Sequence, residues 1–184
     1  YLFIAPALIS LLVFMVYPVI ASFVISGFDW GILTTPKFIG LENYKTLFRD
    51  PVFLESLKNT FVWVIMYVPV SILVSLIVAL AMDMPLRGIG FFRTMFYLPV
   101  MTPMVVCALL FVWIYNTDFG ALNYILSFFK IAPIKWLTDK NIALISIALM
   151  SVWKNFGYNM LILLSALQGI PESLYEAAAL DGIT

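Results

Sequence analysis

The sequence has 184 residues, of which 64% are apolar and 11% are charged, and its mean hydropathy is +1.06. These values exceed what a soluble domain needs and exclude that class of protein. Ten basic and ten acidic residues cancel without forming a basic block, so nucleic acid is excluded as an electrostatic partner. The absence of histidine removes most hydrolase chemistry and the commonest metal ligand.

Four stretches with little or no charge are each long enough to cross a bilayer. They are 1–26, 59–82, 94–117 and 141–169. A helix rises about 1.5 Å per residue and needs roughly 20 residues to cross the hydrocarbon core, so each stretch predicts a transmembrane helix. We therefore predict an all-α, polytopic membrane protein with three parts: a first helix, 1–26, a loop, 27–58, and a core, 59–184.

The connections between these stretches differ in length and content. The first, 29–58, is long and polar, whereas the second, 83–93, is tight and contains two arginines. The third, 118–140, contains a short apolar stretch, 119–129, which we predict to lie along the membrane interface. The two longer connections hold seven basic residues, so basic-residue counting alone would place them in the cytoplasm.

Small residues and prolines predict how the helices pack and bend. Ser71, Ser75 and Ala79 recur every four residues, which places small side chains on one helical face and permits close approach of a neighbouring helix. Prolines remove a backbone donor and crowd the preceding turn, so they predict bends. The prolines concerned are Pro69, Pro99 and Pro103.

A strip of polar side chains follows one face of the fourth stretch. Its members are Ser151, Asn155, Tyr158 and Asn159. Lys154 lies beside the strip, and a lysine near mid-bilayer costs roughly 2.5 to 3.5 kcal/mol on insertion scales, so these groups should face protein or water. One reading makes the strip part of a substrate pathway. In the other, Asn155 and Asn159 hydrogen-bond a neighbouring helix while Lys154 snorkels or pairs with a carboxylate. The sequence leaves both readings open.

The last segment predicts a short helix outside the membrane, over 171–182. Pro171 suits the first helical position, Glu172 the positive end of the helix dipole, and Gly182 a left-handed end. The alanines at 177–179 are strong helix formers. Larger apolar side chains flank them, namely Leu174, Tyr175 and Leu180. This combination is suited to a groove on a soluble partner.

Several motifs carry a resemblance to one family. Residues 176–182, Glu-Ala-Ala-Ala-Leu-Asp-Gly, resemble the EAA loop of permease subunits in binding-protein-dependent ABC importers. Further stretches, spread over nearly the whole chain, are similar to the carbohydrate-uptake branch of that family. They are Phe38-Ile-Gly-Leu-Glu-Asn-Tyr44, Leu57-Lys-Asn-Thr60, Arg87-Gly-Ile-Gly-Phe-Phe-Arg93, Asn116-Thr-Asp-Phe-Gly120 and Val152-Trp-Lys154.

The resemblance implies a type I ABC importer permease fold with six transmembrane helices, of which four are present. We expect the sequence to be truncated at its C-terminus, because it stops at Thr184. In that family the EAA loop is a cytoplasmic coupling helix that docks on an ATPase. The coupling residues implied here are Leu174, Tyr175, Glu176, Ala177, Ala178, Ala179, Leu180, Asp181 and Gly182. A cytoplasmic coupling helix makes the loops 27–58 and 118–140 extracytoplasmic, which overrules the basic-residue count.

The resemblance also implies partners and a location. The partners are a second permease subunit, two ATP-binding subunits, an extracytoplasmic solute-binding protein and membrane lipid. ATP and Mg are expected in the partner ATPase, whereas this chain is expected to bind no cofactor and no metal and to contain no catalytic residue. The implied location is the prokaryotic cytoplasmic (inner) membrane, which the chain crosses several times.

The function implied is ATP-driven import, in which this subunit forms the translocation pathway for a sugar or a related solute. An alternative is a non-transporting membrane scaffold that recruits a soluble partner through its terminal helix. A membrane-embedded enzyme would need an acid-base pair, a nucleophile or a metal cluster facing a shared cavity, and the four apolar stretches contain no carboxylate.

Overall fold

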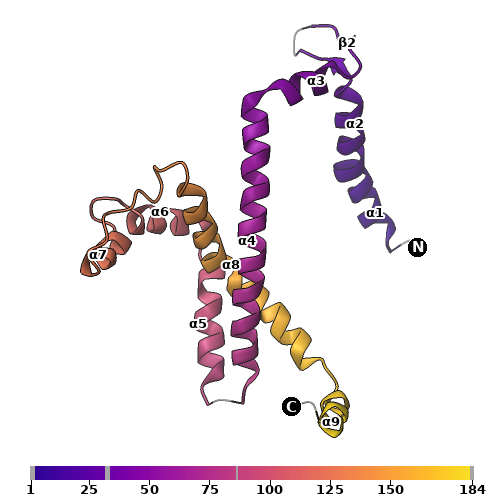
Figure 1. Cartoon of the computed structure of the whole chain (residues 1–184). Helices are drawn as coiled ribbons and strands as arrows, with labels where there is room; N and C mark the ends of the chain where they lie inside the picture. The colour runs from indigo at the N-terminus through magenta and orange to yellow at the C-terminus, as the bar shows by residue number, and fades with distance from the viewer. Residues whose placement is uncertain (1–2, 32–33, 86, 183–184) are drawn as a thin grey trace. The chain divides into compact units, whose positions relative to one another are not determined.

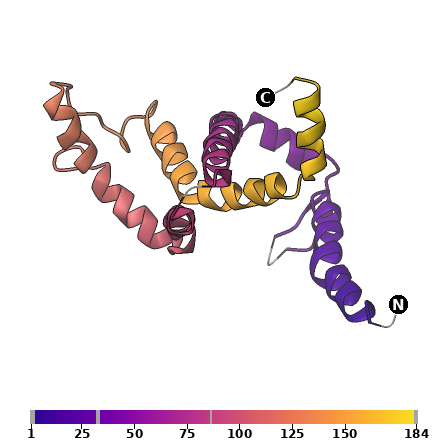
Figure 2. The ribbon, with the colours of Figure 1, turned by 90° about the horizontal axis from the view of Figure 1, so that it is seen from below.

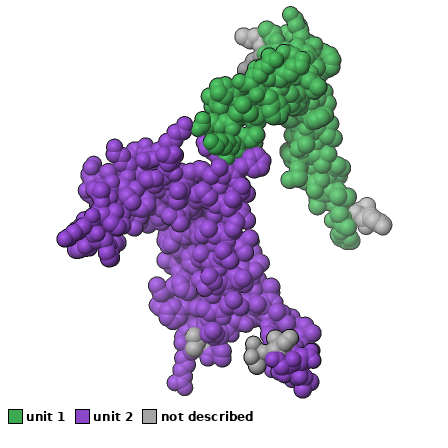
Figure 3. Space-filling model, viewed as in Figure 1, with its two compact units in different colours: residues 1–58 green, residues 59–184 purple. Residues whose placement is uncertain are grey.

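The computed structural model describes residues 3–31, 34–85 and 87–182, which form a mainly helical structure of two compact units. Figure 3 shows the units, residues 1–58 and residues 59–184. The predicted first helix, loop and core each include residues outside this description. These are 1–2, 32–33, 86 and 183–184.

Unit 1 begins with one long helical segment in three parts, coloured indigo in Figure 1: α1 (Ala5–Leu11), the π-helical turn η1 (Leu12–Val16) and α2 (Tyr17–Ile25). Pro18 follows the π turn and cannot donate to the carbonyl of Phe14. A local change of hydrogen-bonding pattern is a usual response to such a missing donor. The 21 residues from Ala5 to Ile25 are long and apolar enough to cross a membrane, and none of them is buried within the unit.

The rest of unit 1 is a short antiparallel strand pair followed by a short helix and the start of a long one. Strands β1 (Phe28–Asp29) and β2 (Lys37–Phe38) pair antiparallel and lead into α3 (Glu42–Arg49). Helix α4 (Pro51–Asp83) then begins with a cap, since the Asp50 carboxylate accepts the backbone N–H of Val52 at 2.8 Å. Its first residue is a proline, which has no N–H to leave unpaired. The division between the units falls within α4.

Among its described residues, unit 2 contains the remainder of α4 and five further helices. They are α5 (Ile89–Met101), α6 (Met104–Ile114), α7 (Ala121–Phe128), α8 (Ala143–Gln168) and α9 (Glu172–Leu180). Helices α4 and α8 are each long and apolar enough to cross a membrane. Helices α5 and α6 pass the same test only as a pair, and they are bent by 95° at their junction (Figure 1). Within the described residues there are thus three candidate spans, or four if the bent pair counts as one.

The three prolines predicted to bend their helices lie at different kinds of position. Pro69 and Pro99 lie inside helices that continue past them, whereas Pro103 lies at the junction where α5 has ended and α6 begins. The predicted third transmembrane helix, 94–117, is therefore two helices with a sharp break. A proline in an apolar run signals a lost donor, but neighbouring groups decide whether the helix breaks there.

The core of unit 2 lies where α8 packs against α5 and the last part of α4. Ala79 and Met82 of α4 contribute to it together with Met160 and Leu164 of α8. The predicted face of small residues on α4 is buried in the same region, with Ser71 2% exposed and both Ser75 and Ala79 fully buried. Small side chains there allow α8 to approach the α4 backbone closely.

Candidate functional site on α8 and α9

The four residues of the predicted pathway strip do not act as one group in the structure. Ser151 and Asn155 hydrogen-bond along their own helix, Ser151 Oγ to the carbonyl of Ile147 at 2.8 Å and Asn155 Nδ2 to the carbonyl of Ser151 at 3.0 Å. Asn159 Nδ2 instead donates to Ser71 Oγ of α4 at 3.1 Å. Tyr158 is exposed. For Asn159, this contact favours the interpretation in which it hydrogen-bonds a neighbouring helix.

Lys154 is 7% exposed, and its partners are main-chain oxygens of α5. Its Nζ donates to the carbonyl oxygen of Pro99 at 2.8 Å and to that of Val100 at 3.0 Å. These main-chain partners differ from both the snorkelling and the carboxylate pairing that the sequence predicts for Lys154. An ammonium placed at the C-terminal end of a helix interacts favourably with the negative end of the helix dipole.

The end of α5 explains why these carbonyls accept a side-chain donor. A helical carbonyl normally accepts from the N–H four residues later, and for Pro99 that residue is Pro103, which has none. The N–H of Thr102 reaches the carbonyl of Pro99 at 3.2 Å, and the Thr102 hydroxyl donates to that of Leu98 at 3.2 Å. Lys154 adds donors to the carbonyls of Pro99 and Val100, so these two oxygens of the broken end are hydrogen-bonded where protein covers them.

Gly157, one turn further along α8, permits this contact, and sequence reasoning missed it. A Cβ at that position would collide with the main-chain carbonyl oxygen of Phe96 and would lie 3.2 Å from the Cα of Tyr97. Helices α5 and α8 thus touch backbone to backbone there. On another side of α8, Ser75 Oγ of α4 donates to the carbonyl of Phe156 at 3.1 Å. A glycine inside an apolar helix was the available signal.

Helix α8 also contacts α6, on the far side of the break. The rings of Phe111 and Trp153 lie 5.2 Å apart, and the hydroxyl of Tyr115 donates to the carbonyl of Ser146 at 3.0 Å. One continuous helix, α8, therefore binds both arms of the bent pair, α5 through Lys154 and α6 through Trp153.

Asn123, in α7, holds the connection that follows α6. Its Nδ2 donates to the carbonyls of Thr117 at 3.0 Å and Ile134 at 2.9 Å, while its Oδ1 accepts the backbone N–H of Ile134 at 3.1 Å and the indole N–H of Trp136 at 3.0 Å. All four hydrogen-bonding positions of the amide are used. The predicted interfacial stretch, 119–129, contains this helix and ends near the loop that Asn123 fixes.

Replacing Asn123 with alanine is expected to loosen the segment between α7 and α8. The change removes the partners of partly buried main-chain groups of Thr117 and Ile134, which costs about 1 to 3 kcal/mol. Lys130 and Lys135 are exposed in this segment, so trypsin should cleave the detergent-solubilised Asn123→Ala protein roughly tenfold faster or more. Ser127→Ala is the control, because the Ser127 hydroxyl only donates to the carbonyl of Tyr124 in its own helix. Equal cleavage rates in both variants would contradict the role given to Asn123.

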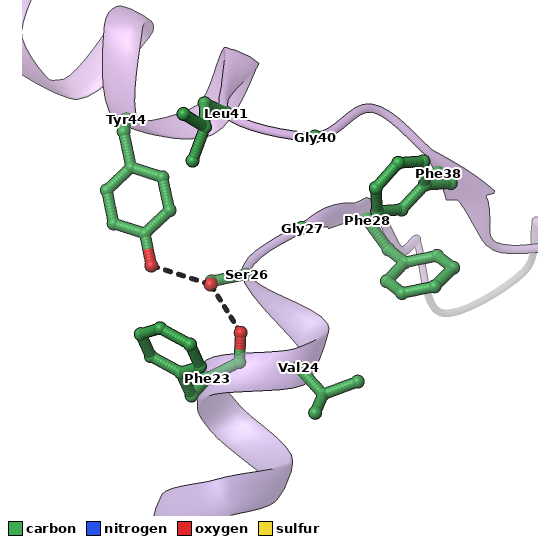
Figure 4. A pocket seen from close by; sticks show the side chains of 9 residues that line it. All are labelled: Phe23, Val24, Ser26, Gly27, Phe28, Phe38, Gly40, Leu41 and Tyr44. Atoms are coloured by element: carbon green, nitrogen blue, oxygen red, sulfur yellow. Dashed lines mark hydrogen bonds between the residues drawn. The ribbon is translucent and has the colours of Figure 1, made fainter.

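In unit 1, the stretch 38–44 closes the end of α2 (Figure 4). Tyr44 Oη and Ser26 Oγ are hydrogen-bonded at 2.7 Å, and Asn43 Nδ2 donates to the carbonyls of Ser26 at 2.8 Å and Phe28 at 3.0 Å. These bonds satisfy carbonyls just past the helix end. Beside them lies an apolar hollow of about 570 Å³ with Phe23, Phe38 and Leu41 on its walls. The family-like sequence of this stretch therefore has a structural purpose within the unit.

Helix α9 contains most of the predicted coupling residues. It spans Glu172–Leu180, so Pro171 precedes it and does not occupy its first turn. Gly182 has a φ of 76°, in the left-handed region expected of a helix end. Only three residues, 169–171, separate α9 from α8, and α9 points in a different direction (Figure 2).

The surface of α9 is largely accessible. None of its residues is buried, and Leu180, at 90% exposed, is the most accessible of its large apolar side chains. Leu174 and Tyr175 are each more than half exposed. A short helix with this much exposed apolar surface is suited to binding another protein.

Comparison with known proteins gives matches along the whole chain, although no family model matches the sequence. A probable ABC transporter permease protein of Pyrococcus horikoshii is 37% identical over 184 residues, which cover 98% of this chain and 63% of the relative. The lactose transport system permease protein LacF of Rhizobium radiobacter is 40% identical over 185 residues, covering 100% of this chain and 62% of LacF.

A solved structure agrees in fold. The crystal structure of a bacterial ABC transporter involved in the import of the acidic polysaccharide alginate matches with a TM-score of 0.82 and 25% sequence identity, over 100% of this chain and 62% of that one. This chain spans about three fifths of the length of the curated relatives it matches. The agreement of sequence and fold along its whole length shows that the chain belongs to the permease proteins of ABC transporters.

Proposed function

We propose that this chain is the membrane-spanning subunit of an ATP-driven importer and forms part of the translocation pathway for a sugar or a related solute. Relatives with a named solute support this class. Their names specify lactose, sulfoquinovosyl glycerol, sn-glycerol-3-phosphate, galactooligosaccharides and trehalose/maltose. What these molecules share is a polyhydroxylated or sugar-derived skeleton, and the chemistry varies too widely among them to name one solute.

The observation that carries the proposal is the exposed helix α9, joined to the spanning helix α8 by three residues. In this proposal α9 lies on the cytoplasmic side and docks in a groove of an ATP-binding subunit. Its alanines allow close approach, and Leu174, Tyr175 and Leu180 supply the apolar contact area. Movement of the ATP-binding subunits would then displace α8 directly.

The proposed assembly contains a second permease subunit and two ATP-binding subunits, which bind ATP and Mg, in the prokaryotic inner membrane. An extracytoplasmic solute-binding protein delivers the solute. Support for this last partner comes from the bacterial alginate ABC transporter, whose crystal structure is of a complex with an alginate pentasaccharide-bound periplasmic protein. The segments around Tyr44 and Asn123 would lie on that side of the membrane.

Co-purification of an ATPase tests the coupling role of α9. We expect an ATP-hydrolysing subunit to accompany the full-length wild-type protein from its native membrane and to be lost from Leu180→Glu and Glu176→Lys. Leu180→Glu forces a charge into an apolar interface, which costs at least about 2 kcal/mol, or roughly 30-fold in affinity, whereas Glu176→Lys reverses a charge on the same helix. Asp118→Lys reverses an exposed charge in the proposed extracytoplasmic loop and should retain the ATPase.

Failure of any ATPase to accompany the wild type would refute the importer assignment. If the ATPase does accompany the wild type, a second experiment deletes the gene and tests growth on a panel of sugars and glycerol phosphates. This experiment separates solute transport from a scaffold that only recruits a soluble partner. Lost growth on one solute supports transport and identifies its class. Unchanged uptake of every solute, with the ATPase still bound, would favour a scaffold that recruits a partner through α9.

A further inference from the structure

The break between α5 and α6 is held by contacts from one helix, α8. Lys154 binds the last turn of α5, and Gly157 lets the two backbones touch at Phe96. Trp153 and Ser146 contact α6 beyond the break. The two arms of the pair meet at 95°, so their relative direction depends on where α8 holds each of them.

Lys154 makes the polar part of this contact. It is the one charged residue in the sequence from Asn141 to Gln168, and it is 7% exposed. Both of its hydrogen bonds go to main-chain oxygens in the last turn of α5, where Pro103 leaves the carbonyl of Pro99 without its usual helical donor. A buried cation is unfavourable without such partners, so the ammonium and the broken helix end stabilise each other.

Helix α8 continues from this contact to α9 without interruption. Lys154 lies fourteen residues before Gln168, the end of α8, a distance of about 21 Å along the helix at 1.5 Å per residue. The linker to α9 has only three residues. A displacement of α9 therefore reaches Lys154 through a rigid element, with no long loop to absorb it.

We infer that Lys154 is a positioning residue, whose ammonium holds the α5–α6 break against α8 and so transmits displacement of α9 to the bent pair. The first part of the inference, the hold on the break, rests on the contacts of Lys154 alone. The second part, transmission from α9, rests on the proposed function. The experiment is designed so that the two parts fail separately.

Cys107 provides the readout. It lies in the first turns of α6, its N–H donates to the carbonyl of Pro103 at 3.1 Å, and its side chain is 1% exposed. A buried thiol reacts with N-ethylmaleimide only when its surroundings open. Because α6 begins immediately after the break, release of the break should expose this thiol.

The test measures alkylation of Cys107 by N-ethylmaleimide in the full-length protein within its membrane, by mass spectrometry of the peptide that contains Cys107. Lys154→Met keeps the apolar stem but removes the donors, and we expect roughly tenfold faster labelling. Lys154→Arg restores a cation with donors and should label within about threefold of wild type. Lys135→Met, an exposed lysine of the preceding loop, is the matched control and should label at the wild-type rate.

Wild-type labelling of Lys154→Met would overturn the inference, because packing of the apolar stem would then suffice. Equally fast labelling of the Met and Arg variants would also overturn it, because a cation with donors would then not restore the hold on the break. If Lys154→Met does not accumulate, Lys154→Gln replaces it. The shorter, neutral amide cannot reach both carbonyls, so several-fold faster labelling is expected, and a wild-type rate would be equally fatal.

The second part is measured by adding ATP to membranes that contain the co-purifying ATPase. We expect ATP to change the labelling rate of Cys107 in the wild type and to leave Lys154→Met unaffected. An equal ATP response in both would overturn transmission through Lys154. Absence of any ATPase would instead refute the proposed function, and the labelling rates without nucleotide would still decide whether Lys154 holds the break.

Discussion

Gly157→Val is expected to prevent α8 from packing on α5. A Cβ at this position would collide with the carbonyl oxygen of Phe96, which is main chain and cannot rotate away. Overpacking in a well-packed core typically costs 1 to 3 kcal/mol and occasionally more, and a collision between two backbones belongs at the upper end. We expect the melting temperature of the detergent-solubilised protein to fall by about 6 °C or more, as measured by size-exclusion chromatography after heating.

Ser165→Val is the control for this experiment. Ser165 lies in the same helix and is exposed, so Ser165→Val introduces the same β-branched side chain into α8 without the collision. The Lys154 contact should also be lost in Gly157→Val, since the two helices must separate. A melting temperature equal to that of Ser165→Val would show that the close approach at Gly157 contributes little to stability.

Ser75→Leu is expected to have a comparably large effect on the other side of α8. Ser75 is fully buried, and its hydroxyl donates to the carbonyl of Phe156 at 3.1 Å. Leucine both removes this hydrogen bond and inserts three additional carbon atoms between α4 and α8. The expected loss of stability is about 3 kcal/mol, detected as a lower melting temperature and as reduced accumulation in the membrane.

Ser75→Ala separates the two causes. Alanine removes the hydroxyl without adding volume, so it should cost only about 1 kcal/mol. Asn159→Leu provides a further comparison, because Asn159 bonds Ser71 on the same face of α4. If Ser75→Leu were no worse than Ser75→Ala, the face of small residues would not be needed for close packing.

Much of the architecture could be predicted from the sequence, because a long apolar run in a membrane can form few structures that satisfy its backbone hydrogen bonds. Spans of the right length require helices, and the spacing of Ser71, Ser75 and Ala79 indicates which face of α4 is buried. The comparison with known permeases confirms the all-α, polytopic membrane fold. The prediction that α9 couples to an ATPase remains a prediction.

The contacts of the polar residues could not be predicted in the same way. Lys154 binds main-chain oxygens. Every residue has a main-chain carbonyl, so the sequence does not indicate which one a lysine binds. A search for a complementary carboxylate therefore finds no partner. Asn123 likewise bonds mostly to backbone groups. The break at Pro103 is equally ambiguous from sequence, because Pro69 and Pro99 have the same chemistry and lie in helices that continue.

A cation that binds main-chain oxygen leaves the side chains around it free to diverge. Substitution of the Val100 side chain keeps the hydrogen bond from Lys154 to the main-chain carbonyl at position 100, provided that the end of α5 stays in place. Position 103 has less freedom, since a residue with an N–H would offer the carbonyl of Pro99 a helical donor in competition with the ammonium. Natural variants of this permease should therefore drift readily at position 100 and change together at positions 103 and 154.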